Sequence, residues 1–183
     1  MDTEDSCLGP GSRSRQPTVS ASICAVVITV SDACARGERE DLSGAVLVEL
    51  LKRSGAEIYE TLVLSDELEP LKSALSEIAV RPKVNLIVTT GGTGFGPRDN
   101  TPEATRSVIE REAPGLAEAM RMETLKHTPM AMISRGVCGI RSGTLIINLP
   151  GSPKGVRESF AVIEPILHHA IDLLAGNTNH RAQ

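Results

Sequence analysis

The sequence predicts an α/β sandwich built around a mostly parallel sheet. Apolar runs of strand length recur along the chain, and amphipathic segments of helix length lie between them. This alternation begins near residue 23 and continues to about residue 176. It is typical of strand–helix–strand units, which place successive strands in parallel. The length of 183 residues suits one domain, and we find no internal repeat.

The first strand is predicted at residues 23–30, where ICAVVITV is continuously apolar and rich in β-branched residues. Such a run is typical of a strand that is buried on both faces. Asp41 can cap a helix that runs to about Ser54, and Gly55 is suited to ending it. Residues 57–64 form a second strand, whose pattern alternates more than the first.

The same order is repeated in the middle of the chain. Residues 69–80 show helical periodicity, and residues 84–88 are a third buried strand. A loop with four glycines follows from Thr89 to Asn100. Thr101 and Pro102 then suit the N-cap and the first position of the next helix.

Three further elements complete the expected fold. Pro114-Gly115 is expected to end the helix that begins at Thr101, and another helix covers about 115–127. Residues 145–149 are a strand. Ser152 and Pro153 begin the last long helix, which ends near Gly176.

The ends of the chain differ from the middle. Residues 1–20 are rich in glycine, proline and serine and hold few apolar side chains, so they cannot offset their ordering entropy. We therefore expect a disordered N-terminal tail at 1–20, one folded domain at 21–176 and a short C-terminal tail at 177–183.

Composition excludes several classes of function. The net charge is −4, and there are two Phe, one Tyr and no Trp, so neither a basic footprint nor stacking platforms for nucleic acid are present. No apolar run approaches the roughly 20 residues that a membrane span requires. The acidic start lacks a signal-peptide pattern, and the four cysteines match no zinc or redox spacing. We expect a cytoplasmic protein in which Cys24 and Cys138 are buried as small apolar residues.

Three segments are placed where ligands bind in open α/β sheets, beyond the carboxyl ends of strands. They are Ser31-Asp32, the loop 89–100, and the segment 148–153. Asp66 also follows a strand. From the residues alone a helix cap at Ser65 or Asp66 is the better reading. Asp32 can likewise be interpreted as a structural residue or as part of a ligand site. The Pro-Gly-Ser-Pro segment is either a simple turn into a helix or a second anion contact.

The glycine-rich loop carries the strongest chemical signal. Its glycines let the backbone approach a ligand, and the helix that follows favours an anion at its N-terminus. Thr90, Thr93 and Thr101 offer hydroxyls, and Arg98 can neutralise phosphate charge. Asp99 is suited to holding Mg²⁺ that bridges to a phosphate. The loop matches neither the P-loop nor the dinucleotide pattern, so it predicts a phosphate or nucleotide site of another kind.

The motifs resemble those of the molybdopterin adenylyltransferase family, which includes Mog-type bacterial proteins and the G domains of the plant enzyme and of gephyrin. The resemblance covers about residues 23–175 and is carried by TVSD at 29–32, DLSG at 41–44, TTGGTGF at 89–95, PRD at 97–99, TPEAT at 101–105, EAPG at 112–115, SR at 134–135 and IINLPGS at 146–152. Two positions differ from the usual pattern. Asn100 stands where Val is common, and Ser152 stands where other members carry Asn or Gln.

This resemblance implies a three-layer α/β/α sandwich that forms a homotrimer. It implies Mg²⁺-dependent transfer of AMP from ATP to the terminal phosphate of molybdopterin, with hand-over of the product to a molybdate-inserting enzyme. Two acidic positions linked to catalysis in the family correspond to Asp66 and Asp99, which reverses the helix-cap reading of Asp66 and makes both candidate metal ligands. The implied contacts to phosphate, pterin or nucleotide are Ser31, Asp32, Thr90, Gly91, Gly92, Thr93, Gly94, Arg98, Pro150, Gly151 and Ser152.

Two alternative functions are weighed against this enzyme. The chain could be a relative that binds molybdopterin without adenylylating it, or a scaffold of the gephyrin type. Retention of both Asp66 and Asp99 argues against a relative that has lost catalysis.

Overall fold

The structure is a computed structural model that describes residues 21–177. The predicted tails lie outside the described residues, except for Asn177. The elements in chain order are β1 (Cys24–Val30), α1 (Asp32–Ala35), α2 (Leu42–Arg53), β2 (Glu57–Leu64), α3 (Leu68–Ala79), β3 (Leu86–Thr90), α4 (Thr101–Val108), β4 (Arg111–Glu112), α5 (Pro114–Leu125), the 3₁₀ helix η1 (Pro129–Ile133), β5 (Cys138–Arg141), β6 (Thr144–Leu149) and α6 (Pro153–Leu174).

The strands form one mostly parallel sheet, as the sequence predicts. Their order is β2-β1-β3-β6-β5-β4. The four strands β2, β1, β3 and β6 are parallel, whereas β5 is antiparallel to both of its neighbours. After β2 the chain crosses β1 and adds β3 on its other side. The boundary between β1 and β3 is therefore a topological switch point, which is where open α/β sheets bind ligands.

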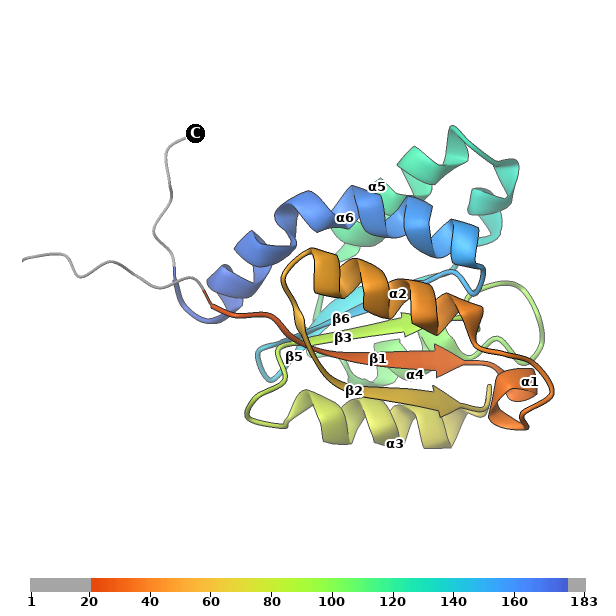
Figure 1. Cartoon of the computed structure of the whole chain (residues 1–183), viewed down its shortest axis with the longest axis horizontal. Coiled ribbons are helices and arrows are strands. Elements are labelled where there is room, and N and C mark those ends of the chain that lie inside the picture. The colour runs from red at the N-terminus through yellow and green to blue at the C-terminus, as the bar shows by residue number, and fades with distance from the viewer. Residues whose placement is uncertain (1–20, 178–183) are drawn as a thin grey trace, which may run out of the picture.

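Helices cover both faces of this sheet and make the predicted three layers (Figure 1). Helices α2, α5 and α6 pack on one face, and α3 and α4 pack on the other. Strand β1 is buried throughout: Ala25 and Val27 belong to the first core, while Val26 and Ile28 belong to the second. This explains why its sequence is continuously apolar rather than alternating.

The antiparallel hairpin of β5 and β6 and the short strand β4 were not predicted. The helix that begins at Thr101 ends at Val108 rather than near Pro114, because the following residues pair with β5. The hairpin turn uses Ser142 and Gly143 with positive φ values of 49° and 83°, the pattern of a type I′ turn. Ser-Gly was a usable turn signal, but two- and four-residue strands carry too little apolar pattern to stand out.

Helix starts were predicted with mixed success. Asp41 and Ser152 cap α2 and α6 as expected, since each side chain accepts an N–H bond in the first turn. The predicted cap at Thr101 is wrong by one residue, because Asn100 is the N-cap of α4. Thr101 instead donates its hydroxyl to the carbonyl of Gly91, at 2.9 Å.

The third strand lies two residues further along than predicted and includes Thr90, which the sequence had placed in the loop. Short helices α1 and η1 are also additions to the predicted elements. Between residues 21 and 177, none of the helices combines the length and the apolar character that crossing a bilayer demands.

Candidate active site

Two adjoining cavities open at the carboxyl ends of β1, β3 and β6, at the switch point of the sheet. We call them the β1-side cavity, of about 440 Å³, and the α5-side cavity, of about 530 Å³. Both are lined by Gly92, Asp99, Gly151 and Ser152, so the glycine-rich loop and the start of α6 form their common wall. The β1-side cavity is further lined by Ser31, Cys34, Arg39, Asp66, Thr90 and Gly91, and the α5-side cavity by Thr93, Gly94, Arg121, Asn148, Pro150 and Lys154.

Short contacts hold the glycine-rich loop against the segment after β6. Gly91 has a φ of +102° and donates its N–H to the carbonyl of Leu149, at 3.2 Å. The hydroxyl of Thr90 donates to the carbonyl of Pro150, at 2.7 Å. Thr90 therefore ties the two loops together with the hydroxyl that the sequence offered to a ligand. Gly151 lies against Gly91, where a Cβ on residue 151 would be 3.1 Å from the Gly91 Cα.

The backbone of the loop is arranged to receive anionic groups. Its described hydrogen bonds use the N–H groups of Gly91, Gly96 and Asp99 as donors. The N–H groups of residues 92–94, which lie between them and line the cavities, are engaged in none of these bonds. Free N–H groups of a glycine-rich turn form a concave anion site, and the N-terminus of α6 faces the same wall.

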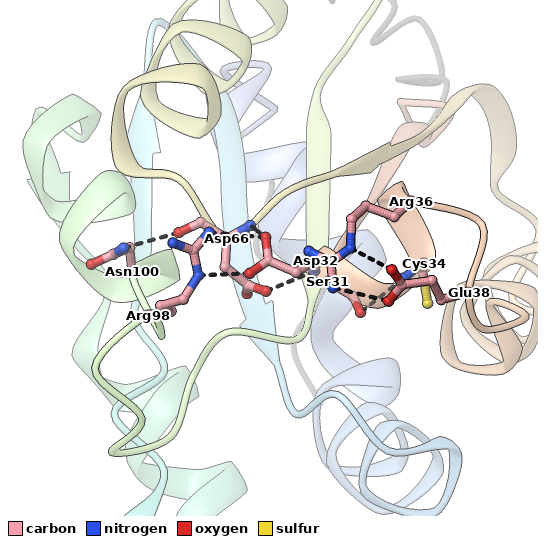
Figure 2. Close-up of polar contacts among 8 residues, drawn as sticks. All are labelled: Ser31, Asp32, Cys34, Arg36, Glu38, Asp66, Arg98 and Asn100. Atoms are coloured by element: carbon pink, nitrogen blue, oxygen red, sulfur yellow. Dashed lines mark hydrogen bonds and ion pairs between the residues drawn. The ribbon is translucent and has the colours of Figure 1, made fainter.

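Asp66 lies in the β1-side cavity and is held by the end of β1 (Figure 2). The backbone N–H of Asp32 donates to Asp66 Oδ2 at 2.8 Å, and the N–H of Asp66 donates back to Asp32 Oδ1 at 3.1 Å. The Asn100 amide donates to the Asp66 carbonyl at 2.9 Å. The helix-cap reading of Ser65 or Asp66 is wrong, because Glu67 is the N-cap of α3 and no side chain caps that helix.

Asp32 and Arg98 pair with each other and line neither cavity. The Arg98 guanidinium donates to both oxygens of Asp32, with Nε–Oδ2 at 2.6 Å and Nη2–Oδ1 at 3.0 Å (Figure 2). The two residues therefore lie beside Asp66. The sequence predicts both of them as contacts to a ligand. Hydrogen bonds from Arg98 lower the pKa of the Asp32 carboxyl, so Asp32 stays ionised well into the acidic range.

The charge balance around Asp66 is different. Partial burial raises the pKa of its carboxyl, and the negative charges of Asp32 and Asp99 raise it further, against the opposing effect of the N–H bond from Asp32. A folded-state pKa above the unfolded value means that protonated Asp66 favours the fold. This contribution is present below the unfolded pKa and is lost as the pH rises through the folded pKa. A cation bound beside Asp66 would offset the burial and the neighbouring negative charges that oppose ionisation of its carboxyl.

The two candidate carboxylates fit Mg²⁺ in the presence of a phosphate ligand. Asp66 and Asp99 both line the β1-side cavity, and each uses Oδ2 to accept one backbone N–H. Within the described residues, no group of three or more His, Cys, Asp or Glu side chains is arranged as a metal cage. Mg²⁺ binds through one or two carboxylates, with water and substrate phosphates as its other ligands. Two carboxylates that line one cavity with the glycine-rich loop match this requirement.

Three cationic side chains in the cavities were missed from the sequence. Arg39 lines the β1-side cavity and donates to Ser31 Oγ at 3.0 Å. Arg121 and Lys154 line the α5-side cavity. Arg39 follows β1, so its position at the carboxyl edge was a usable signal. Arg121 is in the middle of α5, and Lys154 is in the first turn of α6. In the sequence, a single basic residue in a helix cannot be distinguished from one that is exposed to solvent.

Cysteine reactivity gives a direct check of this geometry. Burial raises the pKa of Cys138 to about 12 and also raises the pKa of Cys24, while Cys34 is half-buried and lines the β1-side cavity. Iodoacetamide at pH 8 is expected to modify Cys34 in the native protein and to spare Cys24 and Cys138, because only roughly 10⁻⁴ of the Cys138 thiol is ionised there. Peptide mass spectrometry over time measures each site. Labelling of Cys138 as fast as Cys34 would contradict the described packing.

Comparison with known proteins agrees with the geometry. Residues 26–169 match the family described as a probable molybdopterin binding domain. A molybdopterin adenylyltransferase from Helicobacter pylori is 42% identical over 82% of this chain and 87% of its own length. The molybdenum cofactor synthesis protein cinnamon from Drosophila melanogaster is 41% identical over 86% of this chain, which spans only 26% of that protein. The crystal structure of the molybdopterin biosynthesis enzyme MoaB from Thermus thermophilus superposes with a TM-score of 0.80 at 48% identity, covering 84% of this chain and 97% of that one.

The fold and the site define an α/β protein whose ligand cavities lie at the switch point of a parallel sheet, over a glycine-rich loop. The family match over residues 26–169 identifies the family within this class. The chain belongs to the molybdopterin-binding domain family.

Proposed function

We propose that this chain is a molybdopterin adenylyltransferase of molybdenum cofactor biosynthesis. It transfers AMP from ATP to the terminal phosphate of molybdopterin and releases pyrophosphate. Support comes from the relatives of that name and from one observation above all: two cavities, of about 440 and 530 Å³, share Asp99 and Gly92 in their lining. A reaction that joins two phosphate-bearing compounds requires such a junction.

The reaction places modest demands on the protein. An oxygen of the molybdopterin phosphate attacks the α-phosphorus of ATP, a new P–O bond forms, and the bond from the α-phosphorus to the bridging oxygen of pyrophosphate breaks. The nucleophile is already anionic, so no strong base is required. Catalysis then consists of positioning and of neutralising charge on the phosphoryl oxygens.

Each part of the site has a role in this scheme. The N–H groups of residues 92–94 hold phosphoryl oxygens at the junction. Arg39 supplies positive charge in one cavity, and Arg121 and Lys154 supply it in the other. Asp66 and Asp99 would hold Mg²⁺, which when bound neutralises charge on the phosphates of ATP. Among the predicted ligand contacts, Asp32 and Arg98 position Asp66.

Other features of this proposal come from the family resemblance. We propose a homotrimer that works in the cytoplasm, uses ATP with Mg²⁺, and hands its product to a molybdate-inserting enzyme. We also propose that residues 21–176 form the working domain, which contains the whole of the family match at 26–169.

A turnover assay tests the activity directly. The protein is mixed with molybdopterin, ATP and Mg²⁺, and both pyrophosphate and adenylylated molybdopterin are followed. One pyrophosphate is expected for each adenylylated product, with no product when either substrate is omitted. Tight binding of molybdopterin without any product would reject the enzyme and favour a protein that only binds molybdopterin.

A further inference from the structure

Arg135 lines neither of the two cavities, but it contacts three residues that do. It follows η1, in the segment between that helix and β5. Its backbone N–H donates to the carbonyl of Thr93 at 2.9 Å. Its side chain donates from Nε to the carbonyl of Gly94 at 2.6 Å and from Nη2 to the carbonyl of Asp99 at 2.5 Å. Its Nη1 forms an ion pair with Glu103 in α4. One residue thus contacts both ends of the segment 93–99.

Besides Arg135, the segment is held from outside by the pair of Arg98 with Asp32, which fixes a side chain of the segment rather than its main chain. The described hydrogen bonds within it form one turn, in which the Asp99 N–H donates to the Gly96 carbonyl at 3.0 Å and the Gly96 N–H donates to Asp99 Oδ2 at 2.8 Å. Gly94 and Gly96 lie against the same carboxylate, since a Cβ on either would be 2.9 Å from Asp99 Oδ2. Glycine gives the backbone wide freedom and a large entropy to lose, so a turn of this kind is mobile unless it is anchored.

An arginine suits this anchoring role better than a lysine. The guanidinium is a planar fork whose nitrogens donate in fixed directions, so one side chain can reach two carbonyls and a carboxylate together. A lysine ammonium is a single point on a flexible stem and cannot span Gly94 and Asp99 in the same way. Every nitrogen of the Arg135 guanidinium is engaged with protein groups.

We propose that Arg135 is a positioning residue, which fixes the main chain on both sides of the glycine turn and so holds the Asp99 carboxylate at the junction of the two cavities. Arg135 itself lines neither cavity and acts through Asp99. The kinetic consequences rest on the proposed function. The effect on the loop does not depend on it.

Three variants test the proposal. Arg135→Ala removes the anchor, and Arg135→Lys keeps the charge without the fork. Arg81→Ala is the matched control, because Arg81 forms an ion pair with Glu60 at 2.5 Å and is exposed to a similar degree, 36% against 31% for Arg135. Arg81 pairs with a residue of the edge strand β2 and lines neither cavity.

The first readout is amide hydrogen exchange in the protein without substrates. In Arg135→Ala, exchange is expected to accelerate roughly tenfold or more within residues 93–100, while β1 and β3 keep their protection. Arg81→Ala is expected to leave this segment unchanged. Equal acceleration across the whole domain would mean a general stabilising role, and no acceleration in 93–100 would mean that the turn holds itself. Either result would overturn the proposal, even for a protein that showed no turnover.

The second readout separates positioning from substrate contact. We expect Arg135→Ala to lower kcat by about 10- to 100-fold with little change in KM for ATP, because a small displacement of a reacting group is costly. Arg135→Lys should fall between the parent and Arg135→Ala. A raised KM with unchanged kcat would instead indicate direct contact with substrate.

A double variant identifies the route of the effect. If Arg135 acts through Asp99, then Arg135→Ala should add almost nothing to the loss already caused by Asp99→Asn. Multiplicative losses would show two independent roles and would reject positioning through Asp99. The exchange data remain decisive if Asp99→Asn alone leaves activity too low to measure.

Discussion

Asp66→Asn and Asp99→Asn are each expected to lower kcat for adenylyl transfer by about 10²–10³-fold, as is found when one group that stabilises transition-state charge is removed. Asparagine keeps the shape of the side chain and one carbonyl oxygen. That oxygen can still accept the N–H of Asp32 at position 66 or of Gly96 at position 99. The variants should therefore fold like the parent and lose only the negative charge that suits Mg²⁺.

The measurement is steady-state turnover over a range of Mg²⁺ concentrations, with circular dichroism to confirm the fold. Glu60→Gln serves as the control, since Glu60 is an acidic residue paired with Arg81 away from the cavities. It should leave kcat within about twofold, as is usual for a surface change. Full activity in both Asp66→Asn and Asp99→Asn would remove the two carboxylates from the mechanism.

Gly91→Ala is expected to cost about 4 kcal/mol or more of the free energy of unfolding, or to prevent folding. At a φ of +102° an alanine is strained, and its Cβ would lie 2.2 Å from the carbonyl oxygen of Val30 in strand β1. That neighbour is backbone and cannot rotate away. Backbone strain and a forced shift in the core act together here, which places the change among the few largest single-site effects.

Urea unfolding of Gly91→Ala beside Gly115→Ala checks this estimate. Gly115 is exposed near the start of α5, and a Cβ there would meet no atom within 4 Å. Alanine is the better helix former, so Gly115→Ala should stabilise the protein by up to about 1 kcal/mol. Equal stability of Gly91→Ala and the parent would show that β1 and β3 are not packed as closely as described.

The sequence predicts the parallel part of the fold well because each of its elements has a strong local signal. Strand β1 is continuously apolar, and α2 and α6 begin at residues whose side chains cap them. The glycine-rich loop could be placed at the carboxyl edge by topology alone. Strands β4 and β5 could not be found in this way, since their pairing is decided by partners distant in the sequence rather than by their own short patterns.

For the candidate site, too, the positions of the loops could be predicted but the pairings between side chains could not. Gly92, Asp66 and Asp99 lie at the cavities as predicted, although their roles stay proposals. The expected ligand contacts of Asp32 and Arg98 also stay proposals. The two side chains pair with each other, and a pairing between residues 66 positions apart leaves no trace in local sequence. The same reason hides the contacts of Arg135 with the glycine turn. Residue type and spacing indicate which loops carry chemistry, but not which side chains within them face each other.

The tie between the two loops also bears on how the protein folds. The bonds Asp32–Asp66, Arg98–Asp32 and Thr90–Pro150 join residues 34, 66 and 60 positions apart. Contacts between residues this far apart form late in folding, because the chain loses loop-closure entropy before these contacts stabilise it. The cavities are therefore expected to be complete only when β1, β2, β3 and β6 have docked. A ligand that binds there stabilises the cooperative unit as a whole, rather than one segment of it.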